Sequence, residues 1–205
     1  MPFGSSPWER SPLSRAASRL LGRLHMRGLT AHGVAVSNLT IGVCRTLGLD
    51  EAQTSTAARA AIFHDAGKLE IPEELLDRPG PLRPREWALM RTHPERSERL
   101  VSAIADLADV APIVRHHHER WDGGGYPDRL VGAAIPLAAR VVFACDAFDA
   151  MTSSRPYRPT LSVAEALEEV RAGAGAQFDS AVASALMESV TTSPTLDRPT
   201  AVRHP

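Results

Sequence analysis

Hydrophobic and polar positions follow a helical period along almost the whole chain. Apolar residues return every three or four positions, and few stretches show the strict alternation of a half-buried strand. The stretch 136–151 is so uniformly apolar that its pattern fits either a helix or a strand. Helices are predicted over 16–26, 31–47, 51–65, 84–93, 95–108, 110–120, 163–172 and 180–190. The pattern therefore predicts an all-α domain without internal repeats.

Local signals mark several of the expected helix ends. Gly48 suits the C-terminal cap of the helix over 31–47, and Pro84 suits the first turn of the helix that it opens. Ser162 and Glu165 have the spacing of a capping box, and Asp179 is placed to cap the last helix. A long turn-rich loop separates the histidine-rich helix from the apolar stretch that follows it.

The overall composition is that of an ordinary globular domain. The 205 residues are 43% hydrophobic and 23% charged, which is enough for one sizeable core. Residues 1–14 are rich in Ser and Pro and predict a flexible lead-in, whereas 191–205 predict a disordered tail. The folded domain is therefore expected over 15–190.

Charge, cysteine usage and hydropathy narrow the class of protein further. The net charge of −1 gives no long-range field, so we expect no DNA partner and no anionic membrane. Cys44 and Cys145 are too few for a disulfide framework and predict buried thiols in a reducing compartment. The chain shows no signal peptide and no run of about 18 apolar residues. A soluble, cytoplasmic protein is expected.

Side chains that can bind metals fall on or beside separate predicted helices. Helical bundles build metal sites from side chains that facing helices project inward. A mixture of imidazoles and carboxylates suits iron, manganese or zinc better than calcium or magnesium. Each residue alone would be an ordinary surface or hydrogen-bonded side chain, so the hypothesis depends on their convergence. The candidates are His32, His64, Asp65, His93, His116, His117, His118 and Asp146.

Four segments of the chain together resemble the HD-GYP family, a branch of the HD superfamily of metal-dependent phosphohydrolases. They are HDAGK at 64–68, HP at 93–94, HHERWDGGGYP at 117–127 and DAFDAMTSSRPYR at 146–158. The match runs in order from about His32 to Phe178. The resemblance implies a helical bundle of the HD type with a dinuclear metal site in its core.

The resemblance also implies which side chains hold the metals. His64 and Asp65 correspond to the HD pair, with Asp65 bridging both ions and taking part in catalysis. Helical spacing alone leaves the pairs 116/117 and 117/118 open; the family pattern selects His117 and His118 and leaves His116 outside. The implied ligand set is His32, His64, Asp65, His93, His117, His118 and Asp146.

Substrate contacts follow from the same resemblance. Lys68 is implied both in phosphate binding and in catalysis, since cations supply what the net charge lacks. The implied substrate-binding residues are Lys68, Gly124, Tyr126, Pro127, Arg155 and Arg158. The residues expected to brace the ligands or the loop are Glu119, Arg120, Asp122 and Asp149. Trp87 and Trp121 are expected in the core.

A ligand count is consistent with an open catalytic site. Two octahedral ions offer about twelve positions. The seven side chains, with Asp65 counted twice, fill about eight, and a shared hydroxide fills about two more, so about two stay open for phosphate oxygens. Some family members place a Glu where this chain has Gly28, which predicts two metals rather than three. Gly33 also stands where the family usually has Ser.

The activity that the resemblance implies is hydrolysis of cyclic di-GMP by attack of a metal-bridging hydroxide, with Lys68 and Arg155 assisting. The product is linear pGpG, or GMP if a second cleavage follows. Two alternatives stay open: an HD-type phosphohydrolase acting on another nucleotide, and a non-catalytic cyclic di-GMP sensor or adaptor. About 30 residues before His32 leave no room for a sensory domain, so we expect a bare output domain, a fragment, or regulation by a partner in trans. A homodimer is a further expectation.

Overall fold

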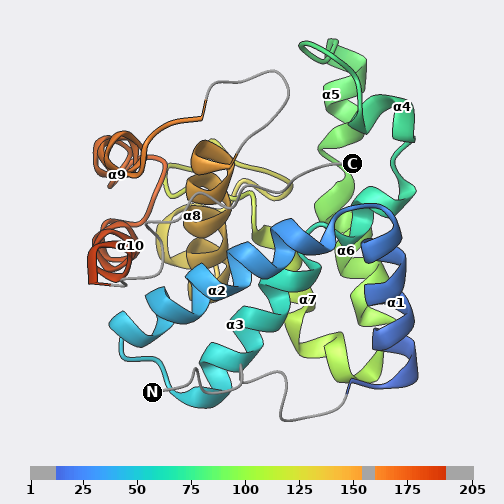
Figure 1. Cartoon of the computed structure of the whole chain (residues 1–205), viewed down its shortest axis with the longest axis horizontal. Coiled ribbons are helices and arrows are strands. Elements are labelled where there is room, and N and C mark those ends of the chain that lie inside the picture. Colours follow the sequence, from blue (N-terminus) through green and yellow to red (C-terminus); the bar gives the residue numbers. More distant parts are fainter. Residues whose placement is uncertain (1–12, 154–159, 193–205) are drawn as a thin grey trace.

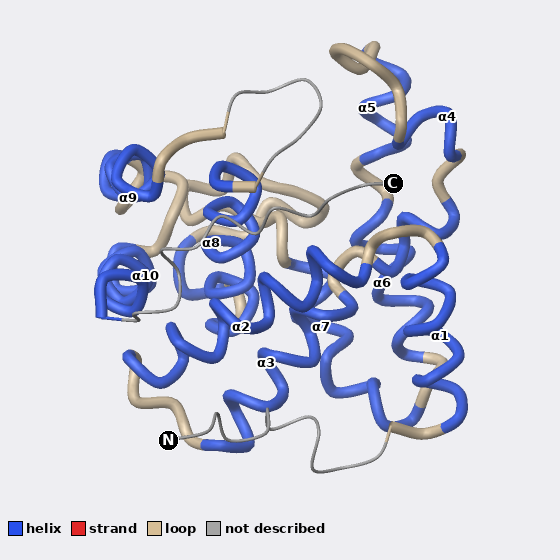
Figure 2. Tube along the Cα trace, in the orientation of Figure 1, coloured by secondary structure: helices blue, strands red, loops and turns tan. Residues whose placement is uncertain are grey.

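The computed structural model describes residues 13–153 and 160–192, and these residues form helices joined by loops (Figure 2). A single bridge between Ala174 and Phe178 is the one strand-like pairing within them. The predicted all-α fold is therefore confirmed. Arg155, Arg158, the first 12 residues and the tail from 193 lie outside the described residues.

The elements follow one another in this order: α1 (Arg15–Met26), α2 (Thr30–Thr46), α3 (Glu51–Phe63), η2 (Ala66–Glu70), α4 (Glu73–Leu76), α5 (Pro84–Met90), α6 (His93–Ser102), η3 (Ala105–Val110), α7 (Ala111–His116), η4 (Gly132–Ala134), α8 (Leu137–Thr152), α9 (Val163–Ala172) and α10 (Ser180–Thr192), where η denotes a 3-10 helix. The ambiguous apolar stretch is thus the helix α8.

The central helices are α2 and α3, which pack against each other and against α8 (Figure 1). Helices α9 and α10 flank one side of this centre, while α1 and α6 lie on the other side. Four buried alanines of α3, at positions 57, 58, 60 and 61, keep this helix narrow and let its neighbours approach closely. This packing brings the N-terminal end of α2, the C-terminal end of α3 and the second half of α8 together at one end of the bundle.

Several caps appear as predicted. Gly48 has a positive φ of 73° directly after α2, where only glycine adopts the left-handed region without strain. The Ser162–Glu165 capping box begins α9. A carboxylate oxygen of Asp179 accepts a hydrogen bond from the Ala181 amide at the start of α10. Both cysteines are buried free thiols.

Other expected helix ends are wrong. The helix predicted over 110–120 ends at His116, because the chain turns there and the buried Glu119 carboxylate binds two amides of the following loop. The helix predicted over 95–108 is divided into α6 and η3, and the one predicted to reach Asp65 ends at Phe63. The short helix α4 was not expected. Tertiary hydrogen bonds set these ends, and periodicity does not report them.

Neither tryptophan that we expected in the core is buried. Trp87 is 47% exposed, because it belongs to α5, a helix that buries none of its residues. Trp121 is half-buried, with the Arg140 guanidinium over its ring at 5.5 Å. In the described part of the chain, no helix combines the length and hydropathy that a membrane span requires.

The contact between α2 and α3 generates a stability prediction at Gly33. A Cβ atom there would lie 2.8 Å from the Ile62 carbonyl oxygen, which is backbone and cannot move alone. We expect Gly33→Ala to lower the free energy of unfolding by about 1–3 kcal/mol, the usual cost of overpacking. Chemical denaturation of the variant and the parent measures this difference.

Gly22 provides the matched control, because it also lies within a helix but a Cβ atom there would meet nothing within 4 Å. Gly22→Ala should raise the free energy of unfolding by up to about 1 kcal/mol, since alanine loses less backbone entropy in a helix. A Gly33→Ala variant as stable as Gly22→Ala would show that α2 and α3 are not in close contact.

Candidate metal centre

All seven side chains in the implied ligand set converge at one end of the helical bundle. Their ligand atoms form three overlapping groups, each within 4.8 Å. The groups are His93, His117 and His118; His32, His64 and Asp146; and His64, Asp65 and His117. They come from α2, α6 and α8 and from the turns after α3 and α7. Residues up to 114 positions apart in sequence thus face one another.

Backbone carbonyls orient three of the imidazoles. In His64, His93 and His117, Nδ1 lies 2.7, 2.8 and 2.6 Å from the carbonyl oxygen of the residue three positions earlier. A carbonyl oxygen can only accept, so Nδ1 carries the proton and Nε2 presents its lone pair to the cluster. This is the tautomer that a metal-binding histidine needs. In metal sites generally, the ring nitrogen that does not bind the metal donates its N–H to a carbonyl or carboxylate in the same way.

The cluster contains polar atoms that other side chains leave unsatisfied. Within the described residues, Nε2 of His64 and Oδ1 of Asp65 are buried and have no hydrogen-bond partner. Nε2 of His93 and Nε2 of His117 lie 3.2 Å apart, although both are acceptors in this tautomer. Adjacent nitrogen ligands of one octahedral ion, each about 2.1 Å from it, stand about 3 Å apart. The donor set therefore fits a divalent cation.

Asp65 lies between the two halves of the cluster. Its Oδ1 is 3.3 Å from Nε2 of His93, and its Oδ2 is 3.4 Å from Nε2 of His64 and 4.0 Å from Nε2 of His32. Each oxygen of the carboxylate thus faces a different set of imidazoles. This is the geometry that a carboxylate bridging two ions requires.

Burial keeps most of the imidazoles neutral. It lowers the pKa of His93 to about 4 and that of His118 to about 3, and it holds the pKa of His117 well below its usual value. For Asp65, burial acts in the opposite sense, but Lys68 and the surrounding histidines outweigh it and hold the pKa of this carboxyl well below its usual range. At neutral pH these groups are already in the protonation states that bind a metal.

His32 differs from the other imidazoles because carboxylates contact both of its nitrogens. Burial lowers its pKa, but hydrogen bonds to Asp146 and Asp149 and the charges of the nearby carboxylates outweigh this and raise the pKa to about 10. Nε2 is 2.9 Å from Oδ1 of Asp146, and Nδ1 is 2.7 Å from Oδ2 of Asp149. Ser153 donates a hydrogen bond to the other Asp149 oxygen. Asp149 therefore braces a candidate ligand, as expected from the sequence.

Hydrogen bonds to Glu119 hold the glycine-rich loop beside the cluster. The buried Glu119 carboxylate accepts hydrogen bonds from the amides of Asp128 (2.6 Å) and Leu130 (3.1 Å). Glycine is required at Gly125, since a Cβ atom there would lie 2.5 Å from Cα of Glu119. The Tyr126 ring stacks on the His118 imidazole, with 4.9 Å between centroids and 26° between planes. The loop thereby places its aromatic ring directly beside a candidate ligand.

Two other loop residues form a local contact. Arg120 and Asp122 pair with each other at 2.6 Å, and Asp122 also accepts a hydrogen bond from the Gly124 amide. These two side chains brace the loop, as expected. Gly124 itself is exposed, and so its backbone is accessible to a substrate.

Lys68 belongs to η2, and its ammonium lies 2.6 Å from Oδ2 of Asp65. The sequence led us to expect a side chain free to reach a phosphoryl oxygen, whereas here it contacts the central carboxylate. The close packing of η2 on α6 fixes this position, because a Cβ atom at Gly67 would lie 2.1 Å from the His93 carbonyl oxygen. The other predicted substrate cations, Arg155 and Arg158, lie outside the described residues.

His116 stands apart from the cluster. Its Nε2 is 2.9 Å from Oδ2 of Asp128, and its Nδ1 is bonded to the Pro112 carbonyl. Arg115 binds the same Asp128 carboxylate through two nitrogens and also reaches Glu98. This network ties the glycine-rich loop to α6 and α7. Sequence reasoning missed it, because the spacing of Asp128 from the histidines follows no helical or strand period.

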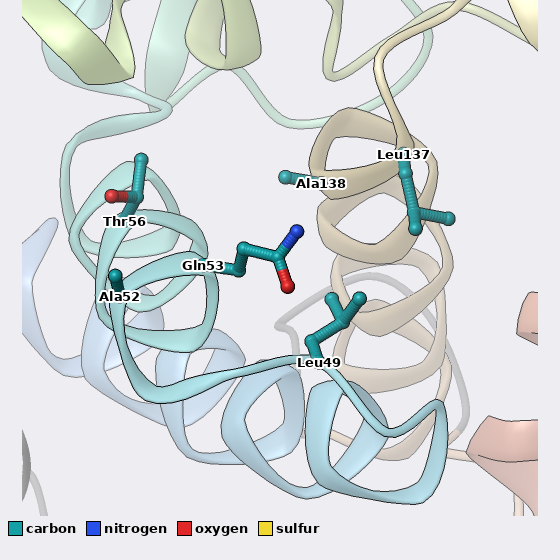
Figure 3. Close-up of a pocket in the computed structure, with 6 residues that line it drawn as sticks. All are labelled: Leu49, Ala52, Gln53, Thr56, Leu137 and Ala138. Atoms are coloured by element: carbon teal, nitrogen blue, oxygen red, sulfur yellow. The ribbon is translucent and has the colours of Figure 1, made fainter.

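A surface pocket elsewhere in the molecule is lined by no titratable side chain. It lies where α3 begins, at the end opposite His64, and Gln53 extends into it (Figure 3). The lining residues are Leu49, Ala52, Gln53, Thr56, Leu137 and Ala138, none of which is titratable.

Comparisons with known proteins find relatives that are cyclic dinucleotide phosphodiesterases. A cyclic di-GMP phosphodiesterase response regulator of Xanthomonas campestris is 39% identical over 181 residues, covering 87% of this chain and 47% of the relative. A cyclic di-GMP phosphodiesterase of Pseudomonas aeruginosa is 38% identical, covering 78% and 38%. A 3'3'-cGAMP-specific phosphodiesterase of Vibrio cholerae is 36% identical, covering 69% and 27%. The chain thus spans about half, or less, of the length of these relatives.

Solved structures share the fold. A HDG"Y"P protein from Bdellovibrio bacteriovorus superposes with a TM-score of 0.65 at 24% identity, covering 79% of this chain and 52% of that one. The family model described as HD domain matches residues 14–182. The resemblance to HD-GYP proteins, predicted from the motifs, is confirmed, and the chain belongs to the HD domain family.

Proposed function

We propose that this chain is a metal-dependent phosphodiesterase that opens cyclic di-GMP to linear pGpG, with GMP as the product of a second cleavage. The observation that carries the proposal is the largely buried cluster of five imidazoles and two carboxylates, in which Nε2 of His64 and Oδ1 of Asp65 have no hydrogen-bond partner. The substrate class rests on the relatives that are cyclic dinucleotide phosphodiesterases. The unit that would carry the activity spans 15–190.

Two divalent ions, iron or manganese, fit the donor set. His93, His117 and His118 would hold one ion, and His32, His64 and Asp146 the other, with one oxygen of Asp65 on each. Ions in such a site supply a hydroxide nucleophile at neutral pH and neutralise the charge of the phosphate. With a shared hydroxide, the seven side chains would fill about ten of the roughly twelve coordination positions, so about two stay open for phosphate oxygens.

The chain's own residues would perform the remaining tasks. Lys68 is the only lysine among the 23 Lys and Arg residues, so the chain uses an ammonium at this one position. An ammonium is a compact charge with three rotatable donors, whereas a guanidinium is a planar fork. At 2.6 Å from Asp65, the ammonium can hold this carboxylate and also stabilise negative charge that develops on the phosphate.

The glycine-rich loop, together with Arg155 and Arg158, would hold the nucleotide. Tyr126 stacks on His118, Pro127 follows it in the loop, and Gly124 offers an exposed backbone for close approach. Arg155 and Arg158 complete the proposed substrate contacts, since guanidinium groups suit phosphate oxygens. A relative specific for 3'3'-cGAMP has a similar identity to this chain, so that substrate belongs in every assay beside cyclic di-GMP. A regulatory partner in trans and a homodimer are part of the proposal.

The first test of this function is metal content. Protein loaded anaerobically with iron(II) or manganese(II) should hold about two equivalents per chain, as the ligand count requires. Asp65→Ala should lower occupancy of both positions and abolish hydrolysis, because one carboxylate contacts both halves of the cluster. Elemental analysis and an assay of cyclic dinucleotide cleavage measure the two effects.

His116→Gln is the matched control, since His116 adjoins the ligands in sequence but bonds to Asp128. It should keep both metals. A stoichiometry near three or near zero, or equal metal loss in the two variants, would contradict the proposed ligand set.

A second test uses Lys68 to separate an enzyme from a non-catalytic sensor. Lys68→Met keeps the apolar stem and removes the charge, so metal content should stay near two equivalents while turnover falls by roughly 10²-fold or more, the scale for losing one electrostatic stabiliser. Lys68→Arg keeps the charge, but its planar fork should restore only part of the rate. Steady-state kinetics with parallel metal analysis measures both.

A non-catalytic sensor predicts a different result for the parent chain and for Lys68→Met. If the parent chain binds cyclic di-GMP but cleaves none with any metal, and Lys68→Met changes affinity alone, the chain is a sensor and the proposed activity is wrong.

A further inference from the structure

Helix α5 presents an aromatic side chain to solvent next to the candidate metal centre. The helix extends from the main body of the bundle (Figure 1) and buries none of its residues. Trp87 on this helix is 47% exposed and is one of three large hydrophobic side chains exposed in the described part of the chain. Trp87 is not among the residues proposed above to bind metal or substrate.

Arg91 connects this tryptophan to the glycine-rich loop. Its guanidinium lies over two aromatic rings, 5.8 Å from the Trp87 centroid and 5.3 Å from the Tyr126 centroid. Tyr126 in turn stacks on His118, a candidate ligand. Four side chains thus form a continuous row from α5 to the metal cluster.

The donor groups of Arg91 are available to a ligand. Arg91 is exposed and has no carboxylate partner among the described residues, whereas Arg96 and Arg99 both pair with Glu70. Among the described residues its guanidinium contacts the two aromatic rings and no hydrogen-bond acceptor, so its N–H groups stay available as donors. The charge is therefore positioned by aromatic rings and is not neutralised.

The backbone near Arg91 is fixed relative to the metal cluster. Arg91 follows α5 directly, and the Met90 carbonyl accepts the hydrogen bond that orients the His93 imidazole. Thr92 donates a hydrogen bond to the Leu89 carbonyl and accepts one from Arg96. The turn that orients a candidate ligand therefore also sets the position of Arg91.

An aromatic ring beside a free guanidinium edge matches a nucleobase. Any of the bases can stack on the exposed Trp87 ring, because each base has an aromatic face. Two parallel N–H groups of an arginine fit O6 and N7 of guanine, whereas adenine presents an amino donor in place of O6. A phosphate would need no ring, and Lys68 is the cation proposed above for the phosphate at the metal centre.

We propose that Trp87 and Arg91 form a nucleobase subsite that selects guanine over adenine in the part of the cyclic dinucleotide away from the phosphate at the metals. This assignment rests on the proposed phosphodiesterase function and names its specificity. Arg91 reads the base edge, and Trp87 supplies the stacking surface.

The kinetic test compares cyclic di-GMP, 3'3'-cGAMP and cyclic di-AMP with the metal-loaded full chain. Arg91→Gln should reduce the preference in kcat/KM for cyclic di-GMP over cyclic di-AMP by about tenfold, within the range for one bidentate base contact. Arg91→Lys should keep part of this preference, because an ammonium can also donate to O6 and N7 of guanine, although without the planar fork of arginine. Trp87→Ala should raise KM for all three substrates alike, and Trp87→Phe should restore it.

Arg85→Gln is the matched control, since Arg85 is an exposed arginine of the same short helix and contacts neither ring. It should leave the preference unchanged. An equal loss for all three substrates in Arg91→Gln, with rescue by Arg91→Lys, would mean a phosphate contact and would overturn the proposal.

A binding measurement separates this inference from the proposed activity. Titration of the full chain with GMP and with AMP, followed by tryptophan fluorescence and calorimetry, needs no turnover. The parent should bind GMP about tenfold more tightly than AMP, and Arg91→Gln should remove the difference. If the difference is present but no cyclic dinucleotide is ever cleaved, the subsite stands and the phosphodiesterase proposal fails. If cleavage occurs but GMP and AMP bind equally, the subsite proposal fails and the activity stands.

Discussion

The main physical constraint on the structure is a buried cluster of candidate ligand atoms, some of which have no hydrogen-bond partner. Backbone carbonyls hold the protons on Nδ1 of three histidines, so their Nε2 lone pairs point at one another and at Asp65. The 3.2 Å separation of two such nitrogens and the unpaired, buried Asp65 oxygen would be costly in a purely protein environment. A divalent cation would remove this cost, because each of these atoms can act as a metal ligand.

Close backbone packing makes this convergence possible. Gly33 lets α2 approach the end of α3, and Gly67 lets η2 lie against α6, so that His32, His64 and His93 meet at one place. Larger side chains at either glycine would separate the helices that carry the ligands. The shape of the bundle and the chemistry of the site are therefore set by the same few contacts, and a loss of packing there is also a loss of ligand geometry.

Sequence reasoning reached the fold, and it selected seven side chains that the structure brings together, for identifiable reasons. Helical periodicity and the cap signals at Gly48 and Ser162 act over a few residues, and so they can be read locally. The choice of His117 and His118 over His116 needed the family motif, because spacing alone left both pairs open. The structure explains the difference: α7 ends at His116, whose imidazole turns to Asp128, and the next two histidines lie in the turn that faces the cluster.

The features that the sequence did not predict all depend on contacts between distant segments. Trp87 was assigned to the core because large apolar residues usually are buried, but its helix buries none of its residues, and the Arg91 guanidinium lies over the Trp87 ring. Arg91 in turn contacts Tyr126, 35 positions later in the chain. The glycine-rich loop therefore has two neighbours that matter for the proposals: its Tyr126 ring stacks on His118 and also contacts Arg91, the arginine that would read the base. The hydrogen bond from the Asp128 amide to the Glu119 carboxylate holds the loop backbone in place. A displacement of this loop would shift both the candidate ligand His118 and the proposed base contact of Arg91, so the loop couples the two proposed sites.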